Sequence, residues 1–215
     1  MSKIILDFGS GNSCCNDKAI IKRMYDELKT VDTGKHEIIV KWQLFQDWYG
    51  NTPLTHEAFD YAYQYGKSLG YKVTSSVFDK PSLDFLLEYD VPFIKLANNR
   101  ALNYLIGEIP RKIPICVSIG EYDPAMQYFK DSWAFPLQND MRIHCVSSYP
   151  AKYDDYIAAF SPGQLHEGIS DHTTCFSLFG KFEPQLIEWH YGLQDSTGLD
   201  AGPFMRTPEM LREVL

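Results

Sequence analysis

The chain has little positive charge for its length. Its 215 residues include 20 lysines and arginines against 28 aspartates and glutamates, which gives a formal net charge of −8. A general nucleic-acid-binding protein needs a basic surface to neutralise phosphates, so this balance argues against that class of protein. A small anionic ligand is not excluded, because a pair of lysines can hold a phosphate inside an acidic protein.

Long apolar runs are also absent, and cysteines are few. No stretch approaches the roughly 20 apolar residues that a membrane-spanning helix requires. The apolar run at residues 4–6 is too short for a signal peptide. The five cysteines are odd in number and lie mostly inside apolar runs, as expected of reduced packing residues. We therefore expect a cytoplasmic protein that has no contact with a membrane.

Strand-like and helix-like segments alternate along the chain. Apolar or alternating runs predict eight strands, at residues 3–9, 37–45, 71–78, 92–98, 114–120, 141–149, 166–170 and 186–193. Helical spacing predicts helices at 17–30, at 55–69, from 79 onward and at 207–215, with shorter ones at 101–109, 124–135 and 153–160. This alternation indicates a compact (β/α)8 TIM barrel with some short connecting helices, formed by residues 1–215 as a single domain. An open doubly wound sheet is the alternative, because periodicity does not show closure.

Charged residues interrupt the apolar strands close to their carboxyl ends, where barrel enzymes carry their active sites. They are Asp7, Lys41, Lys95, Glu188 and His190. Taken alone, each of these residues fits an outward-facing or internally paired side chain as well as a residue of a functional site. Burying an unpaired lysine is costly, so Lys41 and Lys95 together require anionic partners. Those partners are either Asp7 and Glu188 or a bound phosphate or carboxylate.

Two segments each place a histidine where an apolar strand ends. They are Gly168-Ile-Ser-Asp-His-Thr173 and Glu188-Trp-His190, and each has a carboxylate one or two residues before the histidine. An imidazole beside a carboxylate is suited to bind a metal in one tautomer, or to act as a general acid or base. The histidines lie 18 residues apart, about one strand–helix–strand repeat. We therefore expect His172 and His190 to project into the same pocket.

These segments, taken in order, resemble the N-acetylneuraminate (sialic acid) synthase family, whose members condense phosphoenolpyruvate with an N-acylated amino sugar on a barrel. The order and spacing of the segments carry the resemblance, which covers nearly the whole chain. Besides the two histidine segments, it runs through Lys41-Trp-Gln-Leu-Phe45, Ser75-Ser-Val-Phe-Asp79, Phe93-Ile-Lys-Leu-Ala97 and His144-Cys-Val-Ser-Ser-Tyr-Pro150.

The resemblance implies a metal-dependent condensation of phosphoenolpyruvate with an amino-sugar aldehyde, N-acetylmannosamine or similar, that yields a nonulosonic acid and phosphate. His172 and His190 would bind the divalent ion, Mn²⁺ or Mg²⁺. The catalytic residues would be Glu188, Asp7 and His172. The residues that the resemblance places around the substrates are Lys41, Ser76, Lys95, Asn98, Ser147, Tyr149, Ser170 and Asp171.

The chain departs from the family pattern on the sugar side. Asp7 stands where the family has a glutamate, and the segment that follows contains Asn12 but not the usual Asn-His-Asn-Gly. The family's acid after strand eight has either moved one place, to Asp200, or been lost. Typical members continue into a small antifreeze-like domain, whereas this chain ends after the barrel's last helix. We therefore expect a homodimer or a separate lid protein as partner, a different acceptor sugar, or a loss of activity.

Two other functions stay open. The first is a catalytically altered or inactive barrel that binds an anionic ligand, in keeping with the changed loops after strands one and eight. The second is another metal-dependent barrel enzyme, such as an isomerase or a phosphoester hydrolase. Such sites usually use three or more His, Asp or Glu ligands, and only two histidines are well placed at strand ends here.

Overall fold

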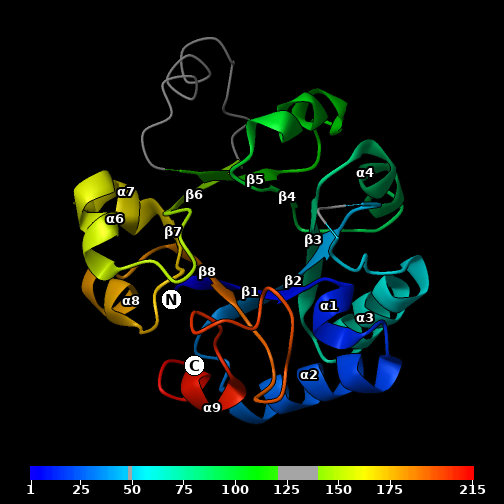
Figure 1. Cartoon of the computed structure of the whole chain (residues 1–215), viewed down its shortest axis with the longest axis horizontal. Helices are drawn as coiled ribbons and strands as arrows, with labels where there is room; N and C mark the ends of the chain where they lie inside the picture. Colours follow the sequence, from blue (N-terminus) through cyan, green and yellow to red (C-terminus); the bar gives the residue numbers. More distant parts are fainter. Residues whose placement is uncertain (48–49, 121–139) are drawn as a thin grey trace.

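Eight parallel strands close into a barrel in the computed structural model, which describes residues 1–47, 50–120 and 140–215. The strands pair in chain order, and the eighth pairs with the first to complete the ring (Figure 1). Closure confirms the predicted TIM barrel and excludes the open doubly wound sheet. The strands are β1 (Lys3–Gly9), β2 (Glu37–Leu44), β3 (Lys72–Val77), β4 (Ile94–Leu96), β5 (Ile115–Ile119), β6 (Met141–Cys145), β7 (Gly168–Ser170) and β8 (Leu186–His190).

The helices lie outside the ring of strands (Figure 1). They are α1 (Gly11–Cys14), α2 (Lys18–Val31), α3 (His56–Ser68), α4 (Lys80–Leu86), the 3₁₀ helix η1 (Arg100–Glu108), α6 (Tyr153–Ala159), α7 (Pro162–Glu167), α8 (Ser177–Phe182) and α9 (Pro208–Leu211). The helix predicted at residues 124–135 lies outside the described residues.

Short polar side chains begin several helices where the sequence predicts them. Asp17 accepts a hydrogen bond from the N–H of Ala19 and so caps α2, while Thr55 caps α3 through the N–H of Ala58. Asp79 caps α4 in the same way. These side chains satisfy backbone donors that have no partner within the first turn, which is why the helices begin there.

The segment between β6 and β8 is more helical than predicted. Residues 166 and 167, predicted as the start of a strand, belong to α7, and α8 was not predicted. Ser161 and Gln164 form a capping box around Pro162, which fixes the first turn of α7. The helix continues from that start until Gly168, so β7 is left with three residues.

An apolar layer fills the barrel interior, and a more polar layer lies on top of it. Side chains two places apart in a strand point to the same face, so each residue of the first layer is followed by one of the second. The apolar layer is Ile5, Ile39, Phe93, Cys116, Ile143 and Leu186. The residues two places further on are Asp7, Lys41, Lys95, Ser118, Cys145 and Glu188. We call these six residues the floor, because they close the bottom of the cavity described below.

The helix α9 packs beside α2 (Figure 1). Leu211 and Leu215 are buried in the same apolar cluster as Leu28 of α2. The hydroxyl of Thr33 donates a hydrogen bond to the carbonyl oxygen of Leu215. Residues 211–215 are therefore fixed against α2 and the segment that follows it.

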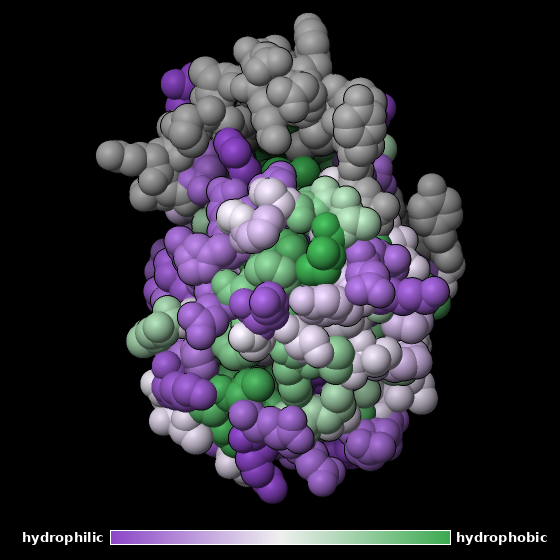
Figure 2. All heavy atoms as spheres, turned by 90° about the vertical axis from the view of Figure 1, so that its left-hand side faces the viewer, coloured by the Kyte–Doolittle hydropathy of each residue, from purple (hydrophilic) through white to green (hydrophobic). Residues whose placement is uncertain are grey.

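The outer surface is mixed in character. Figure 2 shows polar and apolar side chains side by side on the face that carries α6, α7 and α8. Ile157 of α6 is one of the exposed large apolar side chains. Among the described helices, none is both long enough and apolar enough to cross a membrane.

Candidate active site

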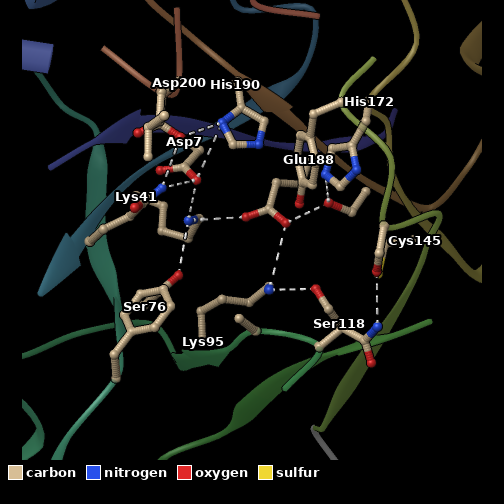
Figure 3. Close-up of a pocket in the computed structure, with 18 of the residues that line it drawn as sticks. Asp7, Lys41, Ser76, Lys95, Ser118, Cys145, His172, Glu188, His190 and Asp200 are labelled. Carbon is tan, nitrogen blue, oxygen red and sulfur yellow. Dashed lines mark hydrogen bonds and ion pairs between the residues drawn. The ribbon is translucent and has the colours of Figure 1, made fainter. Parts of the chain in front are cut away.

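A cavity of about 450 Å³ opens above the floor, at the carboxyl ends of the strands (Figure 3). Every strand contributes at least one side chain to it. The strand residues are Asp7, Lys41, Gln43, Ser76, Lys95, Ser118, Cys145, Ser170, Glu188 and His190. The loops add Phe45, Asn51, Phe78, Ala97, Asn98, Ser147, Tyr149, His172, Leu199, Asp200 and Phe204. The cavity therefore occupies the end of the barrel at which enzymes of this fold carry their chemistry.

The amino group of Lys41 lies between two carboxylates. Its Nζ is 2.7 Å from Oδ2 of Asp7 and 3.2 Å from Oε1 of Glu188, and it donates to Oγ of Ser76 at 2.9 Å. All four side chains are buried. Burial alone would lower the pKa of Lys41, but the charges of Asp7 and Glu188 outweigh it and raise that pKa. Lys41 therefore stays protonated, with the two carboxylates as its partners.

Lys95 approaches the same glutamate from the other side (Figure 3). Its Nζ lies 3.6 Å from Oε2 of Glu188 and donates to Oγ of Ser118 at 2.6 Å. The hydroxyl of Ser170 donates to Oε2 of Glu188 at 3.0 Å. Burial works against ionisation of Glu188, but the charges of Lys95 and Lys41 outweigh it and hold its pKa well below the usual range. The centre of the floor is therefore an ionised carboxylate between two lysines.

His190 faces a second pair of carboxylates. Its Nδ1 lies 3.0 Å from Oδ1 of Asp200 and 3.9 Å from Oδ2 of Asp7. The side-chain amide of Gln43 donates to Asp7 at 2.9 Å and to Asp200 at 3.3 Å. Burial opposes protonation of His190, but the hydrogen bond to Asp200 and the charge of Asp7 outweigh it and raise the pKa of His190. Asp200, which follows the eighth strand, therefore brings a second carboxylate to His190.

His172 is held in one tautomer. Its Nδ1 lies 2.7 Å from the carbonyl oxygen of Val146, so Nδ1 carries the proton and Nε2 holds a lone pair. Nε2 lies 3.3 Å from Oγ of Ser170. Burial, together with the positive charge of His190, lowers the pKa of His172 to about 3. The centre of the His172 ring is 5.5 Å from that of His190, and both histidines line the one cavity, as expected.

Aromatic rings form the rim of the cavity beside the two histidines. Tyr149 stacks on His172 with ring centres 4.1 Å apart, and Phe204 lies edge-on to His190 at 5.0 Å. Tyr149 and Phe204 also touch, at 5.2 Å between ring centres. Tyr149 is 55% exposed and Leu199 is 71% exposed, so this rim faces solvent while the floor does not.

Residues 21–198 match the family model described as the NeuB family. The chain belongs to the NeuB family. This match confirms the resemblance to the sialic acid synthases, which rests on segments in the same part of the sequence.

Individual relatives match this NeuB-family chain in sequence over part of its length. The N,N'-diacetyllegionaminic acid synthase of Legionella pneumophila is 33% identical over 119 residues, which are 49% of this chain and 33% of that protein. An uncharacterized protein of Methanocaldococcus jannaschii is 26% identical over 160 residues, 69% of this chain and 47% of that protein. The chain thus matches between a third and a half of each of these curated relatives.

A solved structure agrees over a greater length. The crystal structure of an N-acetylneuraminic acid (sialic acid) synthetase from Leptospira borgpetersenii matches with a TM-score of 0.75 at 22% identity, over 98% of this chain and 80% of that one. At this identity the likeness concerns the fold.

The NeuB-family barrel offers two sets of donors for a divalent ion, which share His190. In the first, ligand atoms of Asp7, His190 and Asp200 all lie within 4.8 Å of one another. In the second, the predicted pair of His172 and His190 would use its Nε2 atoms, because Nδ1 of His172 faces the carbonyl of Val146 and Nδ1 of His190 faces Asp200. A carbonyl or carboxylate on the far nitrogen is what orients metal-binding imidazoles in proteins. Nitrogen and carboxylate donors suit Mn²⁺ and, with more oxygens, Mg²⁺.

Most of the predicted site residues meet in the cavity. The catalytic candidates Asp7, His172 and Glu188 line it. The substrate-contacting candidates that line it are Lys41, Ser76, Lys95, Asn98, Ser147, Tyr149 and Ser170.

Asp171 is the exception among the predicted substrate contacts. Its carboxylate is fully buried outside the cavity, where it accepts hydrogen bonds from the N–H of Thr173 at 2.8 Å and from Nε1 of Trp189 at 3.0 Å. Ser170 and His172 on either side of it point into the cavity, so the alternation of faces turns the side chain of Asp171 toward the outer layer. The structure corrects the prediction for Asp171, whose contacts are with the protein.

Other cavity residues carry weaker sequence signals. Ser118 follows Cys116 by two places in β5, so strand alternation could have identified it. Phe204 lies in a loop, where no periodicity marks it. Asn12, a candidate for sugar contact, does not line the cavity; its Nδ2 donates to Oδ1 of Asn51 at 2.7 Å, and Asn51 reaches the cavity instead.

Proposed function

We propose that this chain condenses phosphoenolpyruvate with an N-acylated amino-sugar aldehyde, such as N-acetylmannosamine, to give a nonulosonic acid and inorganic phosphate. One observation carries the proposal: two buried lysines and an ionised glutamate lie beside two histidines in one cavity of a NeuB-family barrel. The name of the Legionella relative, a legionaminic acid synthase, supports the synthase class.

The lysines bind the anionic groups of phosphoenolpyruvate. An ammonium group has three donors. Those of Lys41 face Asp7, Glu188 and Ser76. An arriving phosphate or carboxylate replaces one of these contacts at Lys41 and one at Lys95. The hydroxyls freed from the lysines then serve as further donors to the anion.

Glu188 acts through its charge. A carboxylate with a depressed pKa is a weak base that stays ionised, so its value lies in stabilising positive charge. In the condensation, carbon 3 of phosphoenolpyruvate attacks the aldehyde carbon and positive charge develops at carbon 2. Water then adds to carbon 2 and its released proton balances the one gained by the former aldehyde oxygen, which becomes a hydroxyl. Collapse of the tetrahedral carbon 2 to a ketone breaks its bond to the phosphate oxygen, and the phosphate leaves with the proton of the hydroxyl on carbon 2. Asp7 holds Lys41 and His190 in place for these steps.

His190 would hold the divalent ion, together either with His172 or with Asp7 and Asp200. When bound, the ion supplies Lewis acidity to the aldehyde oxygen. The carbonyl of Val146 keeps the proton of His172 on Nδ1, so at neutral pH the lone pair of Nε2 is available to bind a metal ion.

The acceptor sugar enters across the rim. Tyr149 and Phe204 present aromatic surface there, which suits the apolar face of a sugar ring or an acyl methyl group. Asn98 and Ser147 also line the cavity and are joined by a hydrogen bond of 3.2 Å. Their amide and hydroxyl groups are suited to contact sugar hydroxyls.

The test is release of inorganic phosphate from phosphoenolpyruvate by the purified chain, with Mn²⁺ and a panel of N-acylated amino-sugar aldehydes. We expect release that depends on an aldehyde, and loss of release in Glu188→Gln, which keeps the shape of the side chain but removes its charge. Phosphoenolpyruvate binding in calorimetry without release across the panel would instead support the inactive, anion-binding barrel.

A second measurement separates the two donor sets. We expect Mn²⁺ affinity, measured by calorimetry, to fall about 10- to 100-fold in His172→Asn if the two histidines hold the ion. If Asp7→Asn lowers the affinity while His172→Asn leaves it unchanged, the ion belongs to the set formed by Asp7, His190 and Asp200.

A further inference from the structure

Arg206 is a fully buried arginine that follows β8, beyond the residues that match the family model. Its backbone extends the end of the strand: the N–H of Arg206 donates to the carbonyl of His190 at 2.8 Å, and the N–H of Gly192 donates to the carbonyl of Arg206 at 3.2 Å. The backbone of Arg206 is therefore fixed beside that of His190, the histidine that faces Asp200.

The guanidinium group joins two loops. Nη2 donates to the carbonyl of Cys175 at 2.8 Å and lies 3.5 Å from Oδ2 of Asp171, both in the segment after β7. Nη1 donates to the carbonyl of Phe204 at 3.1 Å, in the loop after β8. The group also lies 4.9 Å from the ring centre of Phe176. The guanidinium of arginine is a rigid, planar group with five N–H donors, so it can hold three acceptors in fixed directions.

Each of the two loops carries a side chain of the cavity. In the first loop, Asp171 immediately precedes His172 and is fixed by Thr173 and Trp189 as well as by Arg206. In the second loop, the ring of Phe204 packs edge-on against His190 at 5.0 Å between centres. The guanidinium thus contacts Asp171, the neighbour of His172, and the backbone of Phe204, whose ring packs on His190. It does not itself line the cavity.

Stability alone is a weak reason to keep such an arginine. A buried ion pair gains little over apolar residues of the same volume, because both charges lose their hydration. What the pair does supply is direction, since its hydrogen bonds allow one relative placement of the two loops. We propose that Arg206 is a positioning residue that sets the relative orientation of His172 and His190 through Asp171 and Phe204. The inference rests on the proposed function, in which these histidines hold the divalent ion.

The test compares Arg206→Met, which keeps the length and apolar stem, with Arg212→Met as the matched control. Arg212 is exposed and lies just after α9. We expect Mn²⁺ affinity to fall about 10- to 100-fold in Arg206→Met, the size seen when groups that orient metal ligands are removed. Phosphoenolpyruvate affinity should stay within about twofold, because Lys41 and Lys95 have no contact with Arg206. Arg212→Met should change neither.

A readout that needs no metal or substrate separates this inference from the proposed function. In the metal-free protein, NMR follows the indole N–H of Trp189, which bonds to Asp171, and the Nδ1–H of His172, which bonds to Val146. Both signals should shift or broaden in Arg206→Met and stay in place in Arg212→Met. Unchanged signals with unchanged Mn²⁺ affinity would overturn the inference, even if the wild type releases phosphate. Shifted signals in a protein that releases none would support it and count against the proposed function alone.

If Arg206→Met does not fold, Arg206→Lys takes its place in the same measurements. Lysine keeps a positive charge opposite Asp171 but is not able to reach Cys175 and Phe204 in the same fixed directions. We expect the same movement of the Trp189 and His172 signals. Retention of the wild-type signals in Arg206→Lys would mean that charge, not the fork of donors, is what the site requires, and would overturn the inference.

Discussion

Lys41 is the side chain on which the floor depends most, because it lies against two buried carboxylates. We predict that Lys41→Met lowers the free energy of unfolding by about 3–5 kcal/mol, since removing one member of a buried charge cluster leaves the others uncompensated. Urea denaturation followed by tryptophan fluorescence measures the loss. Lys72→Met is the control, because the Lys72 side chain is 60% exposed in its pair with Glu37 and its loss should cost about 1 kcal/mol or less. Equal losses in the two variants would contradict the prediction.

The pKa values of the two site histidines are shifted in opposite directions, which predicts a stability maximum near pH 6.5 in the metal-free protein. The pKa of His172 is lowered from 6.5 to about 3, so the unfolded chain takes up the proton first as the pH falls. The contribution of His172 to the free energy of unfolding is therefore complete above pH 6.5 and is lost toward pH 3, by up to about 1.4 kcal/mol per pH unit. The pKa of His190 is raised, so its contribution is complete below pH 6.5 and is lost as the pH rises.

The check is urea unfolding with a metal chelator between about pH 5 and about pH 8, the range in which histidines titrate. This range lies above 4.5, the ordinary pKa of Glu188, whose own depressed pKa acts only at lower pH. His172→Asn should reduce the acid slope to the part that comes from His36, whose pKa burial also lowers, and His190→Asn should flatten the alkaline side. A profile that keeps its acid slope in His172→Asn would show that another group causes it.

At the scale of elements, strand alternation is what made much of the site predictable. Asp7, Lys41 and Lys95 share a face with apolar residues two places earlier, and the structure places all three in the cavity. The same alternation turns Asp171 away from the cavity, because Asp171 lies between Ser170 and His172, which both line it. Arg206 lies in an irregular segment, so its direction depends on long-range contacts that no local pattern records.

Helix caps were also predictable, but their second contacts were not. Asp79 caps α4 through the N–H of Ser82 at 2.8 Å and also accepts from the N–H of Gln46 at 2.6 Å, in the loop after β2. We predict that Asp79→Ala costs more than Asp17→Ala, which removes a cap alone and should cost about 1 kcal/mol. Thermal unfolding of both variants measures the difference. A cost for Asp17→Ala that equals that of Asp79→Ala would contradict a role for the second contact.

At the scale of the whole molecule, the strands close a barrel, and α9 and α2 pack against each other outside it. We predict that Leu211→Ala lowers the free energy of unfolding by about 2–5 kcal/mol, because Leu211 is fully buried and its loss leaves a cavity between these helices. Fluorescence and circular dichroism should report one coincident urea transition, since the barrel has no free edge at which to unfold in parts. Separate transitions for the two probes would show that the outer layer melts independently.

The floor has a consequence for which anions can enter the cavity. Its lysines are already matched by carboxylates of the protein, so any incoming anion must take the place of an internal counter-charge. Chloride, with one charge and no fixed shape, gains little from that exchange. A molecule with a phosphate and a carboxylate a few bonds apart can engage both lysines at once. We therefore expect the cavity to select anions by the number and spacing of their charges.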